Sequence, residues 1–201
     1  MFARGRCPVR LRNSGTPTLR YSPMAKPIHT IGHSNRTMAQ LLTLLEEARI
    51  DAVRDVRRFP GSRAHPHFEK SRLERALGEA GIAYAHRPDL GGRRKPLPST
   101  QSPNGLWREA GFRGFADYAL GSSFAEAMEE LVREAQAARI AILCSEAVWW
   151  RCHRRIIADY MLQAGLEVIH ILGPGRAEPA RLTPGAVPQP EGAIHYPPPA
   201  A

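Results

Sequence analysis

The chain lacks the features of membrane and secreted proteins. None of its 201 residues lies in an apolar run of the roughly 18 to 20 residues that a membrane-spanning helix needs. It has only three cysteines, an odd number, so a disulfide framework is not expected. No apolar segment follows the basic N-terminal residues, as it would in a secretory signal. These absences predict a cytoplasmic protein with no membrane partner.

Acidic residues are missing from the start of the chain, and this explains most of the net charge of +9. Residues 1–27 contain six Lys and Arg residues and no Asp or Glu. This composition predicts a disordered leader or, because Met24 offers a second start, an incorrectly assigned beginning. A second basic excess lies in residues 54–95, with eleven Lys and Arg against five Asp and Glu. It suits an anionic ligand, with a solvated basic face as the alternative.

Apolar strand patterns alternate with helical patterns along the remaining chain. Strands are expected at 26–34, 50–56, 82–86, 139–144 and 166–172. Helices are expected at 37–48, 71–80, 112–120, 123–135 and 152–164. Three capping boxes fit helix starts, namely Thr37 with Gln40, Ser71 with Glu74 and Ser123 with Glu126. The alternation predicts a single α/β domain, with a mainly parallel sheet of about five strands flanked by helices.

This domain is expected to span residues 28–185. A long polar stretch, residues 87–113, interrupts the alternation, and connections of that length are usually functional or mobile. From Gly173 onward Pro and Gly are dense, which predicts an irregular chain that ends in a Pro-rich tail at 186–201.

Polar side chains follow the ends of four predicted strands. Because ligands of parallel α/β sheets bind beyond the carboxyl ends of the strands, these side chains are expected to meet at one edge. They are His33 and Ser34 after the first strand, Asp55, Arg57 and Arg58 after the second, His86 and Arg87 after the third, and Cys144 and Glu146 after the fourth.

The segments that carry these residues read TIGHSNRT, VRDVRRFPGSR, LGGRR and LCSEAVWWRCHRRIIADYM. In this order and spacing they resemble the domain of unknown function 488 family, from about residue 28 to about residue 185. The resemblance implies a set of signature positions rather than a reaction. They are His33, Ser34, Asp55, Arg57, Pro60, Ser62, Gly91, Gly92, Cys144, Glu146, Cys152, His153 and Arg154.

A weaker resemblance, of architecture only, is to rhodanese and cysteine-phosphatase folds. In these folds a cysteine-containing anion-binding loop also connects a strand to a helix that begins near an arginine. Six residues separate Cys144 from Arg151, one more than in the phosphatase motif. Trp149 and Trp150 stand where the pattern of the family is usually polar, so the partners of this loop are open.

The first of three functional hypotheses is an enzyme acting on a phosphate-bearing substrate, a nucleotide or nucleic acid. A helix N-terminus and arginine side chains suit such an anion. Cys152 or Cys144 supplies the thiol, His33 or His153 moves protons, and Asp55 or Glu146 orients a base. The predicted anion-binding residues are Ser34, Arg57, Arg58, Arg154, Gly91 and Gly92.

The second hypothesis is a zinc or iron site built from Cys144, Glu146, Cys152, His153 and His33. The cysteine spacing is not a standard zinc spacing and arginines flank it, so no cofactor is predicted. The third is a non-catalytic nucleotide- or nucleic-acid-binding module that uses residues 54–95. Structural roles also fit, with Cys144 packed in the core and Asp55 paired with Arg57. The sequence does not indicate the oligomeric state.

Overall fold

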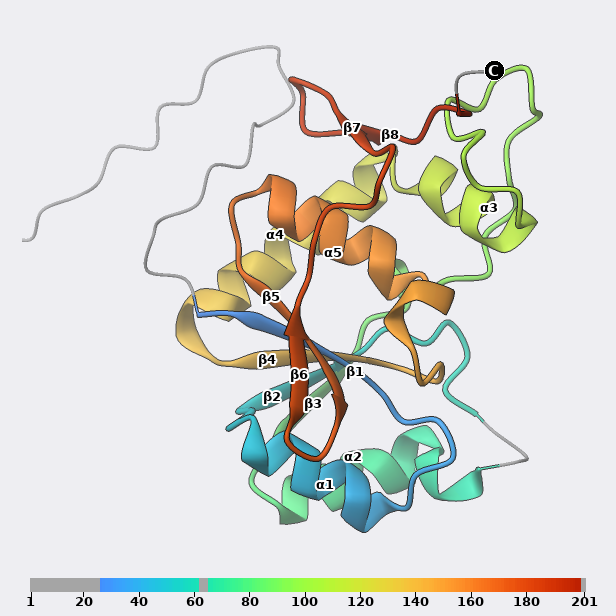
Figure 1. The fold of residues 1–201 in the computed structure, drawn as a ribbon. Helices are drawn as coiled ribbons and strands as arrows, with labels where there is room; N and C mark the ends of the chain where they lie inside the picture. The colour runs from blue at the N-terminus through green and yellow to red at the C-terminus, as the bar shows by residue number, and fades with distance from the viewer. Residues whose placement is uncertain (1–25, 62–64, 200–201) are drawn as a thin grey trace, which may run out of the picture.

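The structure, a computed structural model, describes residues 26–61 and 65–199. The predicted leader therefore lies almost wholly outside the described residues, as does the signature position Ser62. Figure 1 shows a twisted sheet with helices on both of its faces. The expected α/β architecture is confirmed. None of the helices in the described part of the chain has the length and apolar composition needed to cross a bilayer.

The main sheet has six strands in the order β3-β2-β4-β1-β5-β6. The first five in chain order pair in parallel, and β6 pairs antiparallel with β5. All five residues of β4 are buried, as the continuous apolar run at 139–144 predicts. The bounds are β1 (Ile28–Gly32), β2 (Ala52–Asp55), β3 (Ala83–His86), β4 (Ile140–Cys144), β5 (Val168–Gly173) and β6 (Arg176–Pro179).

Helices α1 and α2 cover one face of the sheet, and α4 and α5 cover the other (Figure 1). Each face buries its own apolar cluster: leucines of α1 and α2 pack on β2 and β4, whereas Phe124, Leu131 and Ile157 belong to the cluster of α4 and α5. The helices are α1 (Met38–Glu47), α2 (Lys70–Glu79), α3 (Ala110–Tyr118), α4 (Ser122–Ala137) and α5 (Arg154–Gln163).

Only one of the three predicted capping boxes forms. Thr37 and Gln40 cap α1 reciprocally. The boxes expected from Ser71 and Ser123 are wrong, because each serine already lies inside its helix: α2 begins at Lys70 and α4 begins at Ser122. The start of α5 is also later than expected, since a 3₁₀ turn, η3 (Trp149–Arg151), precedes it.

The chain after Gly173 is more ordered than expected. Gly175, with a φ of 61°, makes the turn that returns β5 into β6. A short ladder of β7 (Val187–Pro188) and β8 (Ile194–His195) follows. Tyr196 is fully buried, and its hydroxyl donates to Asp159 Oδ2 of α5 at 2.9 Å. This segment therefore closes one side of the core.

The long polar stretch at 87–113 is held by a buried carboxylate. It begins with a 3₁₀ turn, η2 (Pro88–Leu90). Asp117 of α3 then accepts hydrogen bonds from the backbone N–H of Leu97 and from the side chains of Ser102 and Asn104. Local bonds of this kind replace regular secondary structure as the source of order in the stretch.

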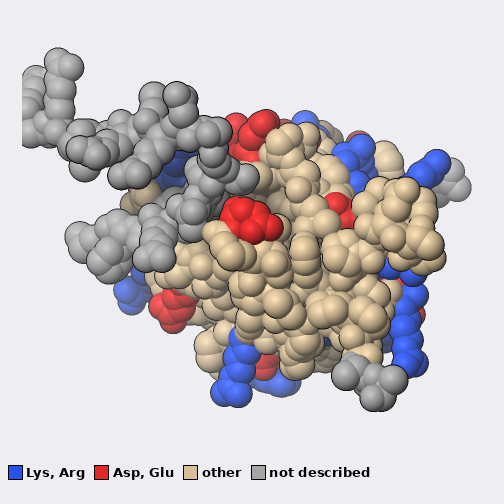
Figure 2. All heavy atoms as spheres, turned by 90° about the horizontal axis from the view of Figure 1, so that it is seen from above, with Lys and Arg blue, Asp and Glu red and all other residues tan. Residues whose placement is uncertain are grey.

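Figure 2 shows the molecule from above the view of Figure 1, from the side on which β7, β8 and α3 lie beyond α4 and α5. The middle of this face is mostly uncharged, and Lys and Arg side chains lie around its edges, on the right, at the bottom and on the left. In Figure 1 the carboxyl ends of β1 and β4 point toward the same side.

Candidate functional site

A pocket of about 920 Å³ opens beyond the carboxyl ends of β1, β2 and β4. These strands are neighbours and their registers align, with Gly32 opposite Cys144 and Asp55 opposite Leu143. The loops that follow the strands therefore meet at one level. Of the predicted site residues, the pocket is lined by His33, Ser34, Arg57, Arg58, Gly92, Cys144, Glu146, Cys152 and His153.

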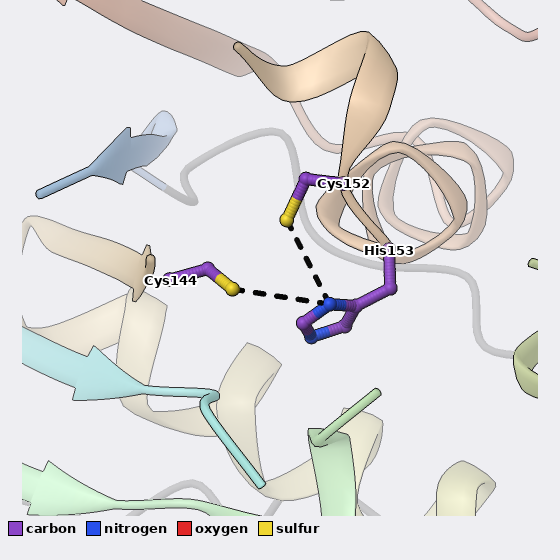
Figure 3. Close-up of side chains that lie close together, drawn as sticks. All are labelled: Cys144, Cys152 and His153. Atoms are coloured by element: carbon purple, nitrogen blue, oxygen red, sulfur yellow. Dashed lines mark hydrogen bonds between the residues drawn. The ribbon is translucent and has the colours of Figure 1, made fainter. Parts of the chain in front are cut away.

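Two sulfur atoms and one imidazole converge in this pocket (Figure 3). His153 Nδ1 lies 3.9 Å from Cys144 Sγ and 3.7 Å from Cys152 Sγ. His153 Nε2 lies 3.2 Å from the carbonyl oxygen of Val56. Because a carbonyl oxygen only accepts, Nε2 carries the ring proton of the neutral imidazole. The lone pair of Nδ1 is thereby directed at the two sulfurs.

Arg154 supports this cluster from the protein interior. Its side chain is 1% exposed, and its Nε donates to Cys152 Sγ at 3.3 Å. A second donor, its Nη2, bonds to the carbonyl oxygen of Glu146 at 2.5 Å and so ties the loop after β4 to α5. Arg154, which was predicted to bind the anion, is not among the described residues that line the pocket.

The pKa values of the two thiols shift in opposite directions. Burial alone raises the pKa of Cys152, but the hydrogen bond from Cys144 and the charge of Arg154 outweigh it and lower that pKa to about 6. The hydrogen bond to Cys152, together with burial, raises the pKa of Cys144 to about 12. Cys152 is therefore the more acidic of the two thiols, and the one that loses its proton more readily.

Asp55 and Arg57 form a buried ion pair. The carboxylate accepts from Arg57 Nε at 2.9 Å and from Arg57 Nη2 at 2.6 Å, and Tyr84 donates a further hydrogen bond to it. Arg57 Nη1 donates to the carbonyl oxygen of Phe68 at 2.8 Å. Most N–H groups of Arg57 are thus engaged within the protein. Asp55 is fully buried and lies behind the pocket rather than on its wall.

His33 is neutral at physiological pH. Burial lowers its pKa to about 4, although a hydrogen bond to the carbonyl oxygen of Ser34 acts in the opposite direction. That bond, from Nδ1 at 2.9 Å, leaves Nε2 as the acceptor, and Arg57 Nη1 lies 3.3 Å from it. Asp55 fixes the position of Arg57, and Arg57 in turn helps to orient the imidazole of His33.

Two arginines of the pocket, Arg93 and Arg151, were not among the predicted anion-binding residues. Both are exposed and line it together with the half-buried Arg58. Glu109 and Glu146 also line the pocket, so its wall is basic but not uniformly so. Arg93 directly follows Gly92 and Arg151 directly precedes Cys152, so their positions beside the family motifs are the signal that could have identified these two arginines.

Glycines allow the loops to approach closely at this edge. A Cβ on Gly32 would lie 1.7 Å from the carbonyl oxygen of Glu146, and one on Gly92 would lie 3.0 Å from His153 Nδ1. Gly91 lies outside the pocket wall, against the backbone of Arg58, where a Cβ would lie 2.9 Å from Cα. Gly32, which precedes His33, was not among the predicted site residues.

Several residues near the predicted edge lie outside the pocket. His86 contacts the carbonyl oxygen of Arg57, and Arg87 pairs with Glu130 and Glu134 of α4. The two tryptophans of the loop are separate from the pocket as well. Trp149 stacks on His170 with ring centroids 4.4 Å apart, whereas Trp150 is 45% exposed.

One group in the described part of the chain has the composition and spacing of a metal site. The ligand atoms of Cys144, Cys152 and His153 lie within 4.8 Å of one another. Glu146 and His33, which the metal hypothesis included, do not belong to this group. Two thiols and one imidazole are ligands that suit zinc.

These features define an α/β protein with a thiol, imidazole and guanidinium pocket at the carboxyl edge of its sheet. The family model described as "Domain of unknown function DUF488" matches residues 37–161, which is more than half of the chain. The chain therefore belongs to this family, as its motifs indicate. No curated protein and no solved structure shows a significant match to it.

Proposed function

We propose that this protein is a cysteine-dependent enzyme acting on an anionic, phosphate-bearing substrate, a nucleotide or a nucleic acid. One observation carries the proposal. Cys152 Sγ accepts a hydrogen bond from Arg154 Nε at 3.3 Å, lies 3.7 Å from His153 Nδ1, and opens into a pocket with exposed arginines. A structural cysteine needs neither the cation nor the imidazole.

Cys152 is the nucleophile in this proposal. Arg154 stabilises its thiolate, and the lone pair of His153 Nδ1 accepts the thiol proton. Attack forms a bond between Sγ and the substrate while the bond to the leaving group breaks. His153 then returns the proton to the leaving group, and water releases the product from sulfur.

The substrate anion is held mainly by three arginines of the pocket wall. Arg58, Arg93 and Arg151 line the pocket with side chains that reach solvent, and guanidinium groups bind phosphate bidentately. His153 is the N-cap residue of α5, so the positive end of the helix dipole lies beside Cys152. Arg57 acts as a positioning residue, because Asp55 and Phe68 occupy most of its donors.

Alkylation with iodoacetamide, mapped by mass spectrometry, tests the proposal in a Cys7→Ser background. We expect Cys152 to react before Cys144. Inorganic phosphate or a mononucleotide should slow the reaction at Cys152 more than sodium chloride of equal ionic strength. The variant Arg93→Gln should weaken this protection, since it removes one anion-binding donor without touching the cysteines.

Protection that is absent with phosphate, mononucleotides and short oligonucleotides alike would contradict a phosphate-bearing substrate. Binding of oligonucleotides that is steeply salt-dependent and unchanged in Cys152→Ser and Cys144→Ser would favour the binding module instead. Both results can be read from the folded protein without knowledge of the leaving group.

A further inference from the structure

We infer that Cys144, Cys152 and His153 form a binding site for a thiophilic divalent cation, best matched by Zn²⁺, and that the bound cation blocks the thiol chemistry of the pocket. The binding itself rests on the geometry of the three side chains. Only the blocking effect rests on the proposed function, in which Cys152 is the nucleophile.

The two distances from sulfur to the imidazole nitrogen are close to those of a tetrahedral zinc site. With Zn–S bonds of about 2.3 Å and Zn–N bonds of about 2.1 Å, a tetrahedron has S···N edges of about 3.6 Å. The two Sγ–Nδ1 distances here are 3.7 Å and 3.9 Å. The two sulfurs lie within 4.8 Å of each other, so all three atoms come into contact with one ion when the side chains close around it.

The imidazole is already oriented as a ligand. Zinc-bound histidines usually donate their other ring N–H to a carbonyl or a carboxylate, which fixes the ring. His153 Nε2 has this partner in Val56, so Nδ1 presents its lone pair to both sulfurs. Gly92 keeps the space beside Nδ1 open, because a Cβ there would lie 3.0 Å from this atom.

The charges of the site favour a divalent cation despite the nearby guanidinium. Two thiolates neutralise Zn²⁺, and Arg154 Nε remains a hydrogen-bond donor to Cys152 Sγ rather than a competing ligand. Arg57, the other buried cation near the pocket, is neutralised by Asp55. The positive charges around the site therefore do not prevent a divalent cation from binding.

Three protein ligands leave a fourth tetrahedral position, and all three residues line the pocket, from which water reaches the ion. Metal binding uses the sulfur and nitrogen lone pairs that nucleophilic attack and proton transfer require. The protein is therefore expected to exist in two exclusive forms, a reactive metal-free form and an unreactive form with the cation bound.

Co²⁺ titration of the full-length, EDTA-treated protein tests the binding. Tetrahedral Co²⁺ absorbs in the visible region, and its thiolate charge-transfer band reports how many sulfurs bind. We expect one ion per chain with two thiolates, displaced by Zn²⁺. Cys144→Ser and Cys152→Ser should each halve the charge-transfer intensity and weaken binding by more than about 100-fold, beyond the cost of losing an outer-shell partner.

The variant Cys7→Ser is the matched control, since it removes the third cysteine and should leave the spectrum unchanged. Absence of the charge-transfer band in the wild-type protein would overturn the inference. A band that persists at full intensity in both Cys144→Ser and Cys152→Ser would also overturn it, because the ion would then be bound elsewhere.

A second measurement avoids variants that fold poorly. One equivalent of Zn²⁺ should protect Cys144 and Cys152 of the wild-type protein from alkylation, leave the alkylation of Cys7 unchanged, and lose its effect when EDTA is added. Unchanged alkylation of both pocket cysteines would refute the inference. Phosphate protection, measured separately in EDTA-treated protein, tests the proposed function, so the two failures are distinguishable.

Discussion

His153 Nε2 donates a hydrogen bond to the carbonyl oxygen of Val56, a residue 97 positions earlier in the chain, across 3.2 Å. This bond connects the residue after β2 to the N-terminus of α5. It also decides which nitrogen of His153 faces the sulfurs, because Nδ1 is left without a proton. A backbone group thus sets the chemistry of the pocket, and no substitution of the Val56 side chain removes it directly.

Replacing Arg154 with Gln should slow alkylation of Cys152. The substitution removes the charged donor to Sγ, and hydrogen bonds to charged groups contribute about 1.5–3 kcal/mol, which corresponds to a rate loss of roughly tenfold or more. This loss is measured as the rate of the reaction of Cys152 with iodoacetamide, in a Cys7→Ser background. The variant should also unfold at lower urea concentration, because the Glu146 carbonyl loses its donor.

Arg155→Gln is the matched control for this experiment. Arg155 is the next residue on α5, but its Nε donates to Thr183 Oγ1 and not to a sulfur. We expect Cys152 to keep its rate in this variant. Equal rates for Arg154→Gln and the unchanged protein would show that the guanidinium does not activate the thiol.

Gly32→Ala should destabilise the loop that carries Glu146. The new Cβ would lie 1.7 Å from the Glu146 carbonyl oxygen and 3.0 Å from Arg154 Nη2, and both are fixed by packing. Overpacking of this kind costs about 1–3 kcal/mol. Urea denaturation measures the loss, and the reaction rate of Cys152 should change with it, because Arg154 bonds to the displaced carbonyl.

Gly78→Ala in α2 provides the comparison. Nothing lies within 4 Å of the added Cβ, and Ala is preferred over Gly inside a helix by about 0.5–1 kcal/mol. This variant should therefore be more stable than the natural protein. If both alanine variants had the same stability, the close approach of Gly32 to the loop would not be a constraint.

The convergence of the site residues follows from features that a sequence displays well. The β4 segment is a continuous apolar run, and parallel strands place the residues after β1, β2 and β4 at one edge. Because the motifs sit directly after these strands, their meeting in one pocket is a consequence of topology. It does not depend on details of side-chain packing.

The direction of individual side chains was not predictable in the same way. The 3₁₀ turn at Trp149–Arg151 delays the start of α5 to Arg154, and this shifts which arginine turns inward. Arg154 is buried and Arg155 is half-buried, a distinction that two adjacent identical residues do not reveal. The pairing of Asp55 with Arg57 was one of two open alternatives, and the structure contains the ion pair.

The C-terminal segment was misjudged for a different reason. Its density of Pro and Gly indicates irregular backbone, yet Tyr196 is fully buried. Its partners are Asp159 and Asn104, which are 37 and 92 positions away. Contacts over such separations leave no local pattern in a single sequence, so the composition suggested a tail where the chain completes the core.

Folding stability should fall between about pH 7.5 and about pH 5.5, partly because of His170. Burial lowers the pKa of this residue to about 4, whereas its ordinary value is 6.5. The charge of Arg154 lowers the pKa further, so the imidazole, which stacks on Trp149 and bonds to Thr30 through Nδ1, is neutral in the folded state. Below its ordinary pKa the unfolded chain binds a proton that the folded chain excludes. Stability is therefore lost as the pH falls, by about 1 kcal/mol at about pH 5.5 for this residue.

Urea denaturation of the wild-type protein and of His170→Phe at both pH values measures this contribution. Phe keeps an aromatic ring against Trp149 but has no titratable group, so the pH-dependent loss should shrink by about 1 kcal/mol. A residual loss is expected, since burial also lowers the pKa of His29 and of His33. An identical pH dependence in the two proteins would mean that His170 is protonated in the folded state, and that the stacked pair with Trp149 tolerates the charge.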